Sequence, residues 1–295
     1  MGVENMNLGE ILKALRLYKE MSIEELAGDI CSPEELREYE EGYKYPAIDQ
    51  LYKIASSLNI ELNQLFDFAT AGSYDYVTAV IDLIKKYKGE RNYQAIYDIV
   101  MREKDNPLFN LSTSRQFLLW HEAICEYYLE EVKQKDKAIA KLYEALNETN
   151  PSRRGLTERE VEILIATALI EKDDHQHEEA IALLKEALDA LEELPVVSDP
   201  RVWLRALFGI SQSLSNLERF EESLIYSNQG INKCINEEVL YLFGEFYYQS
   251  GINYVEIGNP KKGVGYLEKA KKAFDLQNNE LFVDLVNKQL EKILN

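Results

Sequence analysis

One pair of residues, a small side chain followed by an aliphatic one, recurs along the chain at intervals of 40 to 43 residues. Each pair begins a helical stretch. The pairs are Ala95 with Ile96, Ala138 with Ile139, Ala180 with Ile181, Ser223 with Leu224, and Gly263 with Val264. A fixed period of this length is typical of stacked helical hairpins, each of which buries its apolar face against its neighbour. Such arrays bind partners along a concave groove and seldom catalyse reactions.

The composition agrees with a chain built from helices. Only 7 Pro and 14 Gly interrupt 295 residues, and helical periodicity is nearly continuous without an alternating strand pattern. We find no signal peptide and no run near the roughly 18 apolar residues of a membrane-spanning helix. Three widely separated cysteines argue against a disulfide framework. These features predict a cytoplasmic protein that does not enter a membrane.

The charge is strongly negative, at −19 for the whole chain. Residues 1–70 carry 6 basic and 14 acidic side chains, so this segment is the more acidic part per residue. A negative protein gains little from non-specific attraction to nucleic acid. Any DNA binding by this segment therefore has to depend on specific contacts.

Residues 1–70 are expected to form five short helices. Two of them begin with capping boxes, Ser22 with Glu25 and Ser32 with Glu35, and Pro33 occupies the first helical position of the second. Apolar periodicity places a helix before them, another from Ala47 to Leu58, and a fifth over 62–68. Two capped helices joined by a tight turn form a helix-turn-helix.

This segment resembles the helix-turn-helix domain of the phage-repressor (Xre/Cro) class. The residues that carry the resemblance are Leu15, Arg16, Lys19, Met21, Ser22, Leu26, Ala27, Tyr39, Glu40, Gly42, Tyr45, Pro46, Leu51, Ile54, Ala55, Leu58 and Leu65. The class pairs an Arg on the first helix with a Glu that ends the third, here Arg16 and Glu40. The resemblance implies DNA contacts through Ser32, Pro33, Glu34, Arg37, Glu38, Tyr43 and Lys44.

The segment also departs from its class. Ile23 replaces the Gln that usually opens the second helix, and Arg37 is the only cation on the recognition helix. Glu34, Glu38 and Glu41 have no evident structural role in the sequence. A Glu can accept a hydrogen bond from cytosine, but an unpaired carboxylate repels phosphate. The alternative is a helix-turn-helix that has lost DNA binding and serves dimerisation or protein contact.

Paired helices are expected from about residue 74 onwards. Pro107, Pro151 and Pro195 recur every 44 residues, just beyond the second helix of successive pairs, where Pro ends a helix. This arrangement resembles a tetratricopeptide array with long repeats. The expected pairs are 75–88 with 92–104, 113–131 with 134–149, 157–172 with 176–193, 200–217 with 219–235, and 238–257 with 260–275, followed by a capping helix over 279–294.

The combination of the two parts resembles the RNPP family of peptide-regulated transcription factors, and within it the PlcR type. Local similarities include the segments 93–97, 219–224 and 246–249. The resemblance implies an all-α fold: a five-helix helix-turn-helix domain over 1–70, then a right-handed superhelix of five tetratricopeptide-like hairpins and a capping helix over 71–295. It further implies a homodimer that binds promoter DNA and takes up a short signalling peptide in the concave array.

The densest basic cluster, Lys85, Lys86, Lys88 and Arg91, lies at the turn between the first two helices of the array. Charge-assisted hydrogen bonds from it would hold carboxylates of a peptide. The resemblance assigns this role to Lys86 and Lys88. The alternative is a solvated turn, which is what most charge runs are.

A second set of candidates lies on later helices. Gln249 and Asn253 are four residues apart and share a helix face with Tyr248, and amides bind a peptide backbone whatever its side chains. The weaker candidates Arg205, Gln212 and Asn216 lie on the preceding first-of-pair helix. A hand alignment places the family's backbone-binding Asn at Gly209. The alternative for these residues is packing between repeats.

No motif indicates catalysis or a cofactor, so we predict that the protein is not an enzyme and holds neither cofactor nor metal. His175 and His177 are close in sequence, but two imidazoles in a loop without a thiolate nearby are more often solvated than metal ligands. Cys31 lies before a helix N-terminus, where a thiol pKa can fall. A small packed residue is the favoured interpretation of Cys31.

Overall fold

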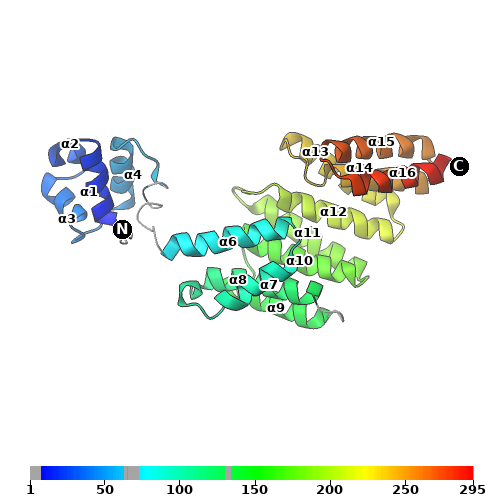
Figure 1. The fold of residues 1–295 in the computed structure, drawn as a ribbon, viewed down its shortest axis with the longest axis horizontal. Helices are drawn as coiled ribbons and strands as arrows, with labels where there is room; N and C mark the ends of the chain where they lie inside the picture. Colours follow the sequence, from blue (N-terminus) through cyan, green and yellow to red (C-terminus); the bar gives the residue numbers. More distant parts are fainter. Residues whose placement is uncertain (1–7, 63–64, 66–72, 130–133, 295) are drawn as a thin grey trace. The chain divides into compact units, whose positions relative to one another are not determined.

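The computed structural model describes residues 8–62, 65, 73–129 and 134–294, which are helical throughout with short turns (Figure 1). The helices of the first 92 residues are α1 (Leu8–Tyr18), α2 (Ile23–Ala27), α3 (Pro33–Glu40), α4 (Ile48–Ser57) and α6 (Ser73–Gly89). They are followed by α7 (Tyr93–Glu103), the 3-10 helix η1 (Pro107–Phe109), α8 (Ser112–Leu129), α9 (Lys135–Thr149), α10 (Glu158–Asp173), α11 (His177–Glu193), α12 (Arg201–Asn216), α13 (Phe220–Asn236), α14 (Phe243–Glu256), α15 (Pro260–Leu276) and α16 (Glu280–Leu294). The predicted all-helical fold, with a helix-turn-helix followed by paired helical repeats, is confirmed.

The chain divides into two units, Met1–Asn92 and Tyr93–Asn295. The predicted boundary after residue 70 falls outside the described residues and stays a prediction. None of the described helices combines the length and apolar character needed to cross a lipid bilayer.

In the first unit, α1–α4 enclose an apolar core. Leu12, Leu26, Leu36 and Ile54 are fully buried in it. Both predicted capping boxes are present: Ser22 Oγ accepts from the backbone N–H of Glu25 at 3.1 Å, and Ser32 does the same for Glu35 at 3.1 Å. These caps fix where α2 and α3 begin. Of the predicted fifth helix, Leu62 and Leu65 are helical, and the rest lies outside the described residues.

In the second unit, consecutive helices pack as antiparallel pairs, α8 with α9, α10 with α11, α12 with α13, and α14 with α15, and α16 packs on α15. The small residues of the repeated pair allow this close approach. Ala138 and Ala180 are buried, and a Cβ at Gly263 would lie 2.8 Å from the carbonyl oxygen of Gly251 on α14. The repeat therefore marks the contact between the helices of a pair, as expected.

The start of α14 differs from the prediction. The helix begins at Phe243 rather than at residue 238, because Glu238 and Leu242 adopt left-handed backbone conformations with φ of 55° and 58°. Neither is a Gly or Asn, the residues that usually mark such positions, so the sequence carried no signal that the helix begins only at Phe243.

Candidate functional sites

The predicted DNA-contacting residues lie along α3 and the turn that follows it. Ser32 caps the helix and Pro33 is its first residue, while Glu34 and Arg37 are exposed on its outer side. Leu36, Tyr39 and Glu40 point into the core and fix the rotation of the helix. The helix therefore presents its polar side to solvent, as a recognition helix requires.

Both cations of this surface are paired with carboxylates. The Arg37 guanidinium lies 3.7 Å from Glu24 on α2, and the Lys44 ammonium lies 2.6 Å from Glu38 on α3. The hydrogen bond to Glu38 raises the pKa of Lys44. The expectation that Glu38 has no structural role was wrong, because the turn at Gly42, with φ of 76°, brings Lys44 back onto α3. Arg37 and Lys44 are thus each paired with a neighbouring carboxylate in the structure without DNA.

Aromatic side chains extend this surface beyond α3. Tyr43 and Tyr45 are 78% and 79% exposed, and the backbone N–H of Tyr43 donates to the carbonyl of Glu38 at 2.9 Å. Phenolic hydroxyls are neutral donors that suit phosphate oxygens without adding charge. In an acidic unit they are the groups beside Arg37 and Lys44 that best fit a nucleic-acid backbone.

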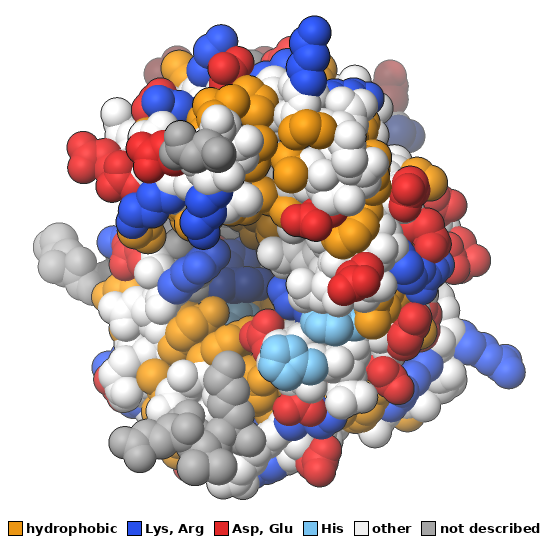
Figure 2. Space-filling model, turned by 90° about the vertical axis from the view of Figure 1, so that its right-hand side faces the viewer, with side chains coloured by type: hydrophobic (Ala, Val, Ile, Leu, Met, Phe, Trp, Pro, Cys, Tyr) orange, Lys and Arg blue, Asp and Glu red, His pale blue; other side chains and the backbone are white. Residues whose placement is uncertain are grey.

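In the second unit, the first helices of three successive pairs leave one row each partly exposed. We call these rows the array face. It comprises Glu162, Ala166, Leu169 and Asp173 of α10, Arg205, Phe208, Gln212 and Ser215 of α12, and Gln249 and Ile252 of α14. Spacings of three and four residues place each row on one side of its helix. Figure 2 shows one side of the molecule with a hollow, which has Lys and Arg side chains around it and imidazoles at its edge.

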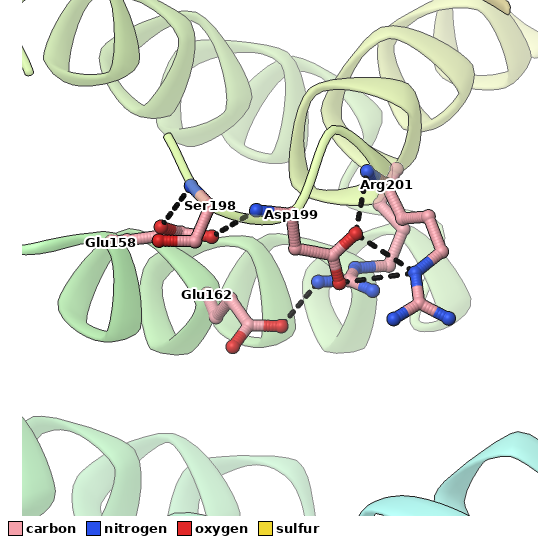
Figure 3. Close-up of polar contacts among 6 residues, drawn as sticks. Glu158, Glu162, Ser198, Asp199 and Arg201 are labelled. Carbon is pink, nitrogen blue, oxygen red and sulfur yellow. Dashed lines mark hydrogen bonds and ion pairs between the residues drawn. The ribbon is translucent and has the colours of Figure 1, made fainter. Parts of the chain in front are cut away.

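One end of the array face is closed by an ionic network between α10 and the N-terminus of α12 (Figure 3). Glu158 accepts from the backbone N–H groups of Ser198 at 2.7 Å and Asp199 at 2.9 Å. Burial alone would raise the pKa of Asp199, but hydrogen bonds from Arg201 hold it below its usual range. This network fixes the loop before α12 against α10.

Arg205 extends the same network onto the array face. Its guanidinium forms an ion pair with Glu162, drawn as a dashed line from Glu162 in Figure 3. The predicted peptide-binding role of Arg205 therefore has to use the guanidinium N–H groups that do not face Glu162.

The other end of the array face holds a polar pocket of about 270 Å³. It is lined by Lys172, Asp173, His175, His177, Gln212 and Asn216. The Lys172 ammonium donates to Gln212 Oε1 at 2.8 Å, which ties α10 to α12. Gln212 and Asn216 were predicted from the sequence as peptide ligands, whereas Lys172 was missed, since nothing in its local sequence distinguishes it from a solvated lysine.

Asn253 lies in the interior rather than on the array face. Its side chain is fully buried; its Nδ2 donates to Ser223 Oγ at 2.7 Å, and its Oδ1 accepts from Ser215 at 2.7 Å and Gln249 at 3.1 Å. The prediction that Asn253 contacts a peptide does not fit this burial. Asn253 instead holds the amide of Gln249, whose Oε1 is left to accept a hydrogen bond.

Tyr248 is half-buried, and burial raises its pKa. It packs against the cluster of Leu267, Ala270 and Phe274, so the packing interpretation accounts for part of this ring. Gly209 is also explained by packing, because a Cβ there would lie 2.8 Å from Leu184 of α11. A side chain at position 209 would point toward α11, so the alignment that placed a peptide-binding Asn there does not fit the geometry.

The basic cluster lies in the first unit, on the C-terminal part of α6 and the turn after it. Lys85 is exposed and 3.5 Å from Asp82, Lys86 is exposed, and Arg91 occupies the turn with φ of 54°. Lys88 is half-buried. The role of these four residues as peptide ligands stays a prediction.

The remaining sequence candidates have structural explanations. No three His, Cys, Asp or Glu side chains among the described residues are placed to hold a metal ion. Burial, and then Glu35, raise the pKa of the Cys31 thiol, which is the opposite of activation. Trp120 is buried, and Trp203 is partly buried beneath the ammonium of Lys233.

Two family models match the chain. Residues 12–65 match a helix-turn-helix, and residues 82–295 match the RNPP family C-terminal domain. The chain belongs to the RNPP family. It is therefore a peptide-responsive transcriptional regulator that binds DNA, as the sequence predicted. The prediction that the chain is not an enzyme is confirmed as well. Comparison with curated protein sequences gave no match.

Solved structures share the fold of this RNPP protein. PlcR of Bacillus thuringiensis, crystallised with the peptide PapR7 and DNA, is 23% identical with a TM-score of 0.81, over 95% of this chain and 98% of PlcR. ComR from S. thermophilus, in complex with DNA and its signalling peptide ComS, is 14% identical with a TM-score of 0.65, over 98% and 100%. The pheromone receptor Rgg2 of Streptococcus dysgalactiae is 16% identical with a TM-score of 0.64, over 97% and 99%.

Proposed function

We propose that this RNPP protein is a cytoplasmic homodimer that binds promoter DNA through α3 and is controlled by a short peptide bound on the array face. The observation that carries the proposal is the joining of a capped helix-turn-helix to an RNPP C-terminal domain in one chain. PlcR and ComR, which share this fold, were crystallised with both DNA and a peptide. In this class the recognition helix enters the major groove, and a dimer reads two half-sites.

On the DNA side, Arg37 is the residue that would read bases, since it is the exposed cation of α3. Tyr43 and Lys44 would contact phosphate from the turn after the helix. Glu24 and Glu38 compete for these two cations, so binding requires the surface ion pairs to open. Surface pairs cost little to break, typically less than about 1 kcal/mol.

On the peptide side, the array face offers an apolar floor at Ala166, Leu169 and Phe208 between two polar ends. An extended peptide gains about 3.3 Å per residue, so five to eight residues would span several repeats. Gln249, held by Asn253, would accept a hydrogen bond from the peptide backbone. Lys85, Lys86, Lys88 and Arg91 lie in the first unit and stay a separate proposal for contacts to peptide carboxylates.

A gel shift with the protein's own promoter region tests the DNA part of the proposal. The full-length protein should retard this fragment at concentrations that leave a scrambled fragment free. Sedimentation velocity on the same sample should give a dimer. Failure to retard either fragment would instead favour a peptide- or protein-binding repeat scaffold whose acidic helix-turn-helix no longer binds DNA.

A further inference from the structure

The polar pocket at the end of the array face contains two nitrogen groups whose bonding capacity is not fully used, the Lys172 ammonium and the His177 Nδ1 atom. Lys172 donates to the neutral Gln212, and its nearest carboxylate oxygen, on Asp173, is 3.9 Å away. The other oxygen of Asp173 accepts from Tyr128 at 3.0 Å. The Nδ1 atom of His177 is buried without a hydrogen-bond partner. A buried polar atom of this kind costs free energy until a ligand or water satisfies it.

We propose that this pocket is a carboxylate subsite for the regulatory peptide, in which Lys172 and His177 hold one carboxylate group. The inference rests on the proposed function, because it assigns a part of the ligand to one end of the array face. Gln212 uses its oxygen toward Lys172, which leaves its Nε2 group as a further donor. His177 is the first residue of the 17-residue helix α11, whose dipole also favours an anion there.

A carboxylate fits this pocket better than a phosphate. Asp173 lines the same pocket, so its carboxylate offsets the charge of the Lys172 ammonium. A singly charged ligand meets less repulsion from Asp173 than a doubly charged phosphate does.

The groups around the pocket leave Lys172 and His177 available. On the C-terminal side of α10, Glu171 and Asp174 are paired with Lys135 of α9 at 3.2 and 2.8 Å. At the start of α11, Glu178 faces Arg219 at 3.3 Å. These three carboxylates therefore already have their own cations.

Ligand binding in this pocket takes up a proton. Burial lowers the pKa of Lys172, and burial followed by the charges of His175 and Lys172 lowers the pKa of His177. A bound carboxylate reverses the electrostatic part of this effect and raises the pKa of His177. Carboxylate affinity therefore increases as the pH falls through the pKa of His177 and decreases above it.

The test follows the histidines of the full-length protein by NMR. The chain has three His, so protein labelled at histidine carbons gives one imidazole signal for each of His121, His175 and His177. His121 is buried and hydrogen-bonded to Phe117, and it serves as the internal control. The probes are N-acetyl-glycylglycine, its C-terminal amide, N-acetyl-glutamate α-amide with only a side-chain carboxylate, and inorganic phosphate, at matched ionic strength.

We expect a carboxylate probe near saturation to raise the pKa of His177 by about one unit, while the amide leaves it unchanged. The effect should vanish in Lys172→Met and persist in Lys185→Met, a lysine two helical turns further along α11. Whichever carboxylate probe acts identifies a C-terminal or a side-chain source. Equal pKa values of His177 with the carboxylates and the amide, or a response to phosphate alone, would overturn the inference.

This titration needs neither promoter DNA nor the signalling peptide. Failure here would therefore leave the proposed function standing. Conversely, a carboxylate effect in a protein that binds no promoter DNA would reject the proposed function and keep the subsite.

Discussion

Arg16 and Glu40 lock the first helix of the DNA-binding unit to the end of the third through two parallel hydrogen bonds. Arg16 Nε donates to Glu40 Oε1 at 2.6 Å, and Arg16 NH2 donates to Oε2 at 2.9 Å. A third donor of the same guanidinium reaches the carbonyl of Met21 at 3.0 Å. The two residues are 7% and 5% exposed, so the pair is desolvated, and the hydrogen bond to Glu40 raises the pKa of Arg16.

Removing one member of this pair leaves the other as a buried charge. We expect Arg16→Ala or Glu40→Ala to destabilise the unit by about 3–5 kcal/mol. The double variant should cost less than the sum, with a coupling of roughly 0.5–3 kcal/mol. Hydrogen exchange of α1–α4 in the full-length protein measures the loss of stability of each variant, with Lys44→Ala as an exposed control. Strict additivity would show that the two side chains do not interact.

Glu24 and Glu38 should lower the affinity for DNA. Replacing either with Gln keeps its size and releases Arg37 or Lys44, so non-specific DNA affinity should rise. Each cation that then contacts phosphate should steepen the slope of log affinity against log salt by about 0.9. Asp105→Asn, on the exposed turn after α7, is the charge-matched control. An effect of the control as large as that of Glu38→Gln would reduce the explanation to net charge.

Two glycines in the array should respond oppositely to the same substitution. A Cβ at Gly230 of α13 would lie 2.2 Å from the ring of Phe246, whereas a Cβ at Gly265 of α15 would meet nothing within 4 Å. Gly230→Ala should therefore destabilise the array by at least about 1–3 kcal/mol through overpacking. Gly265→Ala should stabilise it by about 0.5–1 kcal/mol through helix propensity. Thermal unfolding curves compare the two directly, and a similar effect of both would contradict the packing of α13 on α14.

Peptide binding should depend on Gln249 and on the basic cluster in different ways. Gln249→Ala should weaken the binding of peptides of different sequence alike, because this amide would hold the peptide backbone. Lys86→Glu with Lys88→Glu should weaken acidic peptides most strongly, and added salt should do the same. Calorimetric titration with candidate peptides measures both, with Lys261→Glu and Lys272→Glu on α15 as the matched charge reversal. If the double variant at Lys86 and Lys88 binds as tightly as the parent, that cluster is a solvated turn.

The fold could be predicted because its signals are local or periodic. The capping boxes at Ser22 and Ser32 set helix starts within four residues of sequence, and the small residues at Ala138 and Ala180 recur once per repeat. The start of α14 could not be predicted, since Leu242 adopts a left-handed conformation that its side chain does not favour. Tertiary packing, rather than local preference, sets that boundary.

The candidate sites were less predictable because their contacts cross repeats. Lys172 meets Gln212 forty residues later, and Glu162 meets Arg205 forty-three residues later. The spacing of Gln249 and Asn253 placed the two amides together. It could not show that the Asn253 amide is hydrogen-bonded to the serine hydroxyls of Ser215 and Ser223. Sequence periodicity gives the side of a helix, and the structure decides which polar side chains have already found partners.

The central claim is that a peptide on the array controls DNA reading by α3, and fluorescence anisotropy with labelled promoter DNA tests it most directly. The wild-type protein is titrated into its own promoter fragment with and without a peptide of five to eight residues that calorimetry shows to bind. The peptide should change the affinity for this fragment by about fivefold or more, in the range of ordinary allosteric coupling. Arg37→Ala should cost about 1–3 kcal/mol of the specific affinity, and Arg115→Ala in the array should not. An affinity that neither the bound peptide nor Arg37→Ala alters would contradict the account.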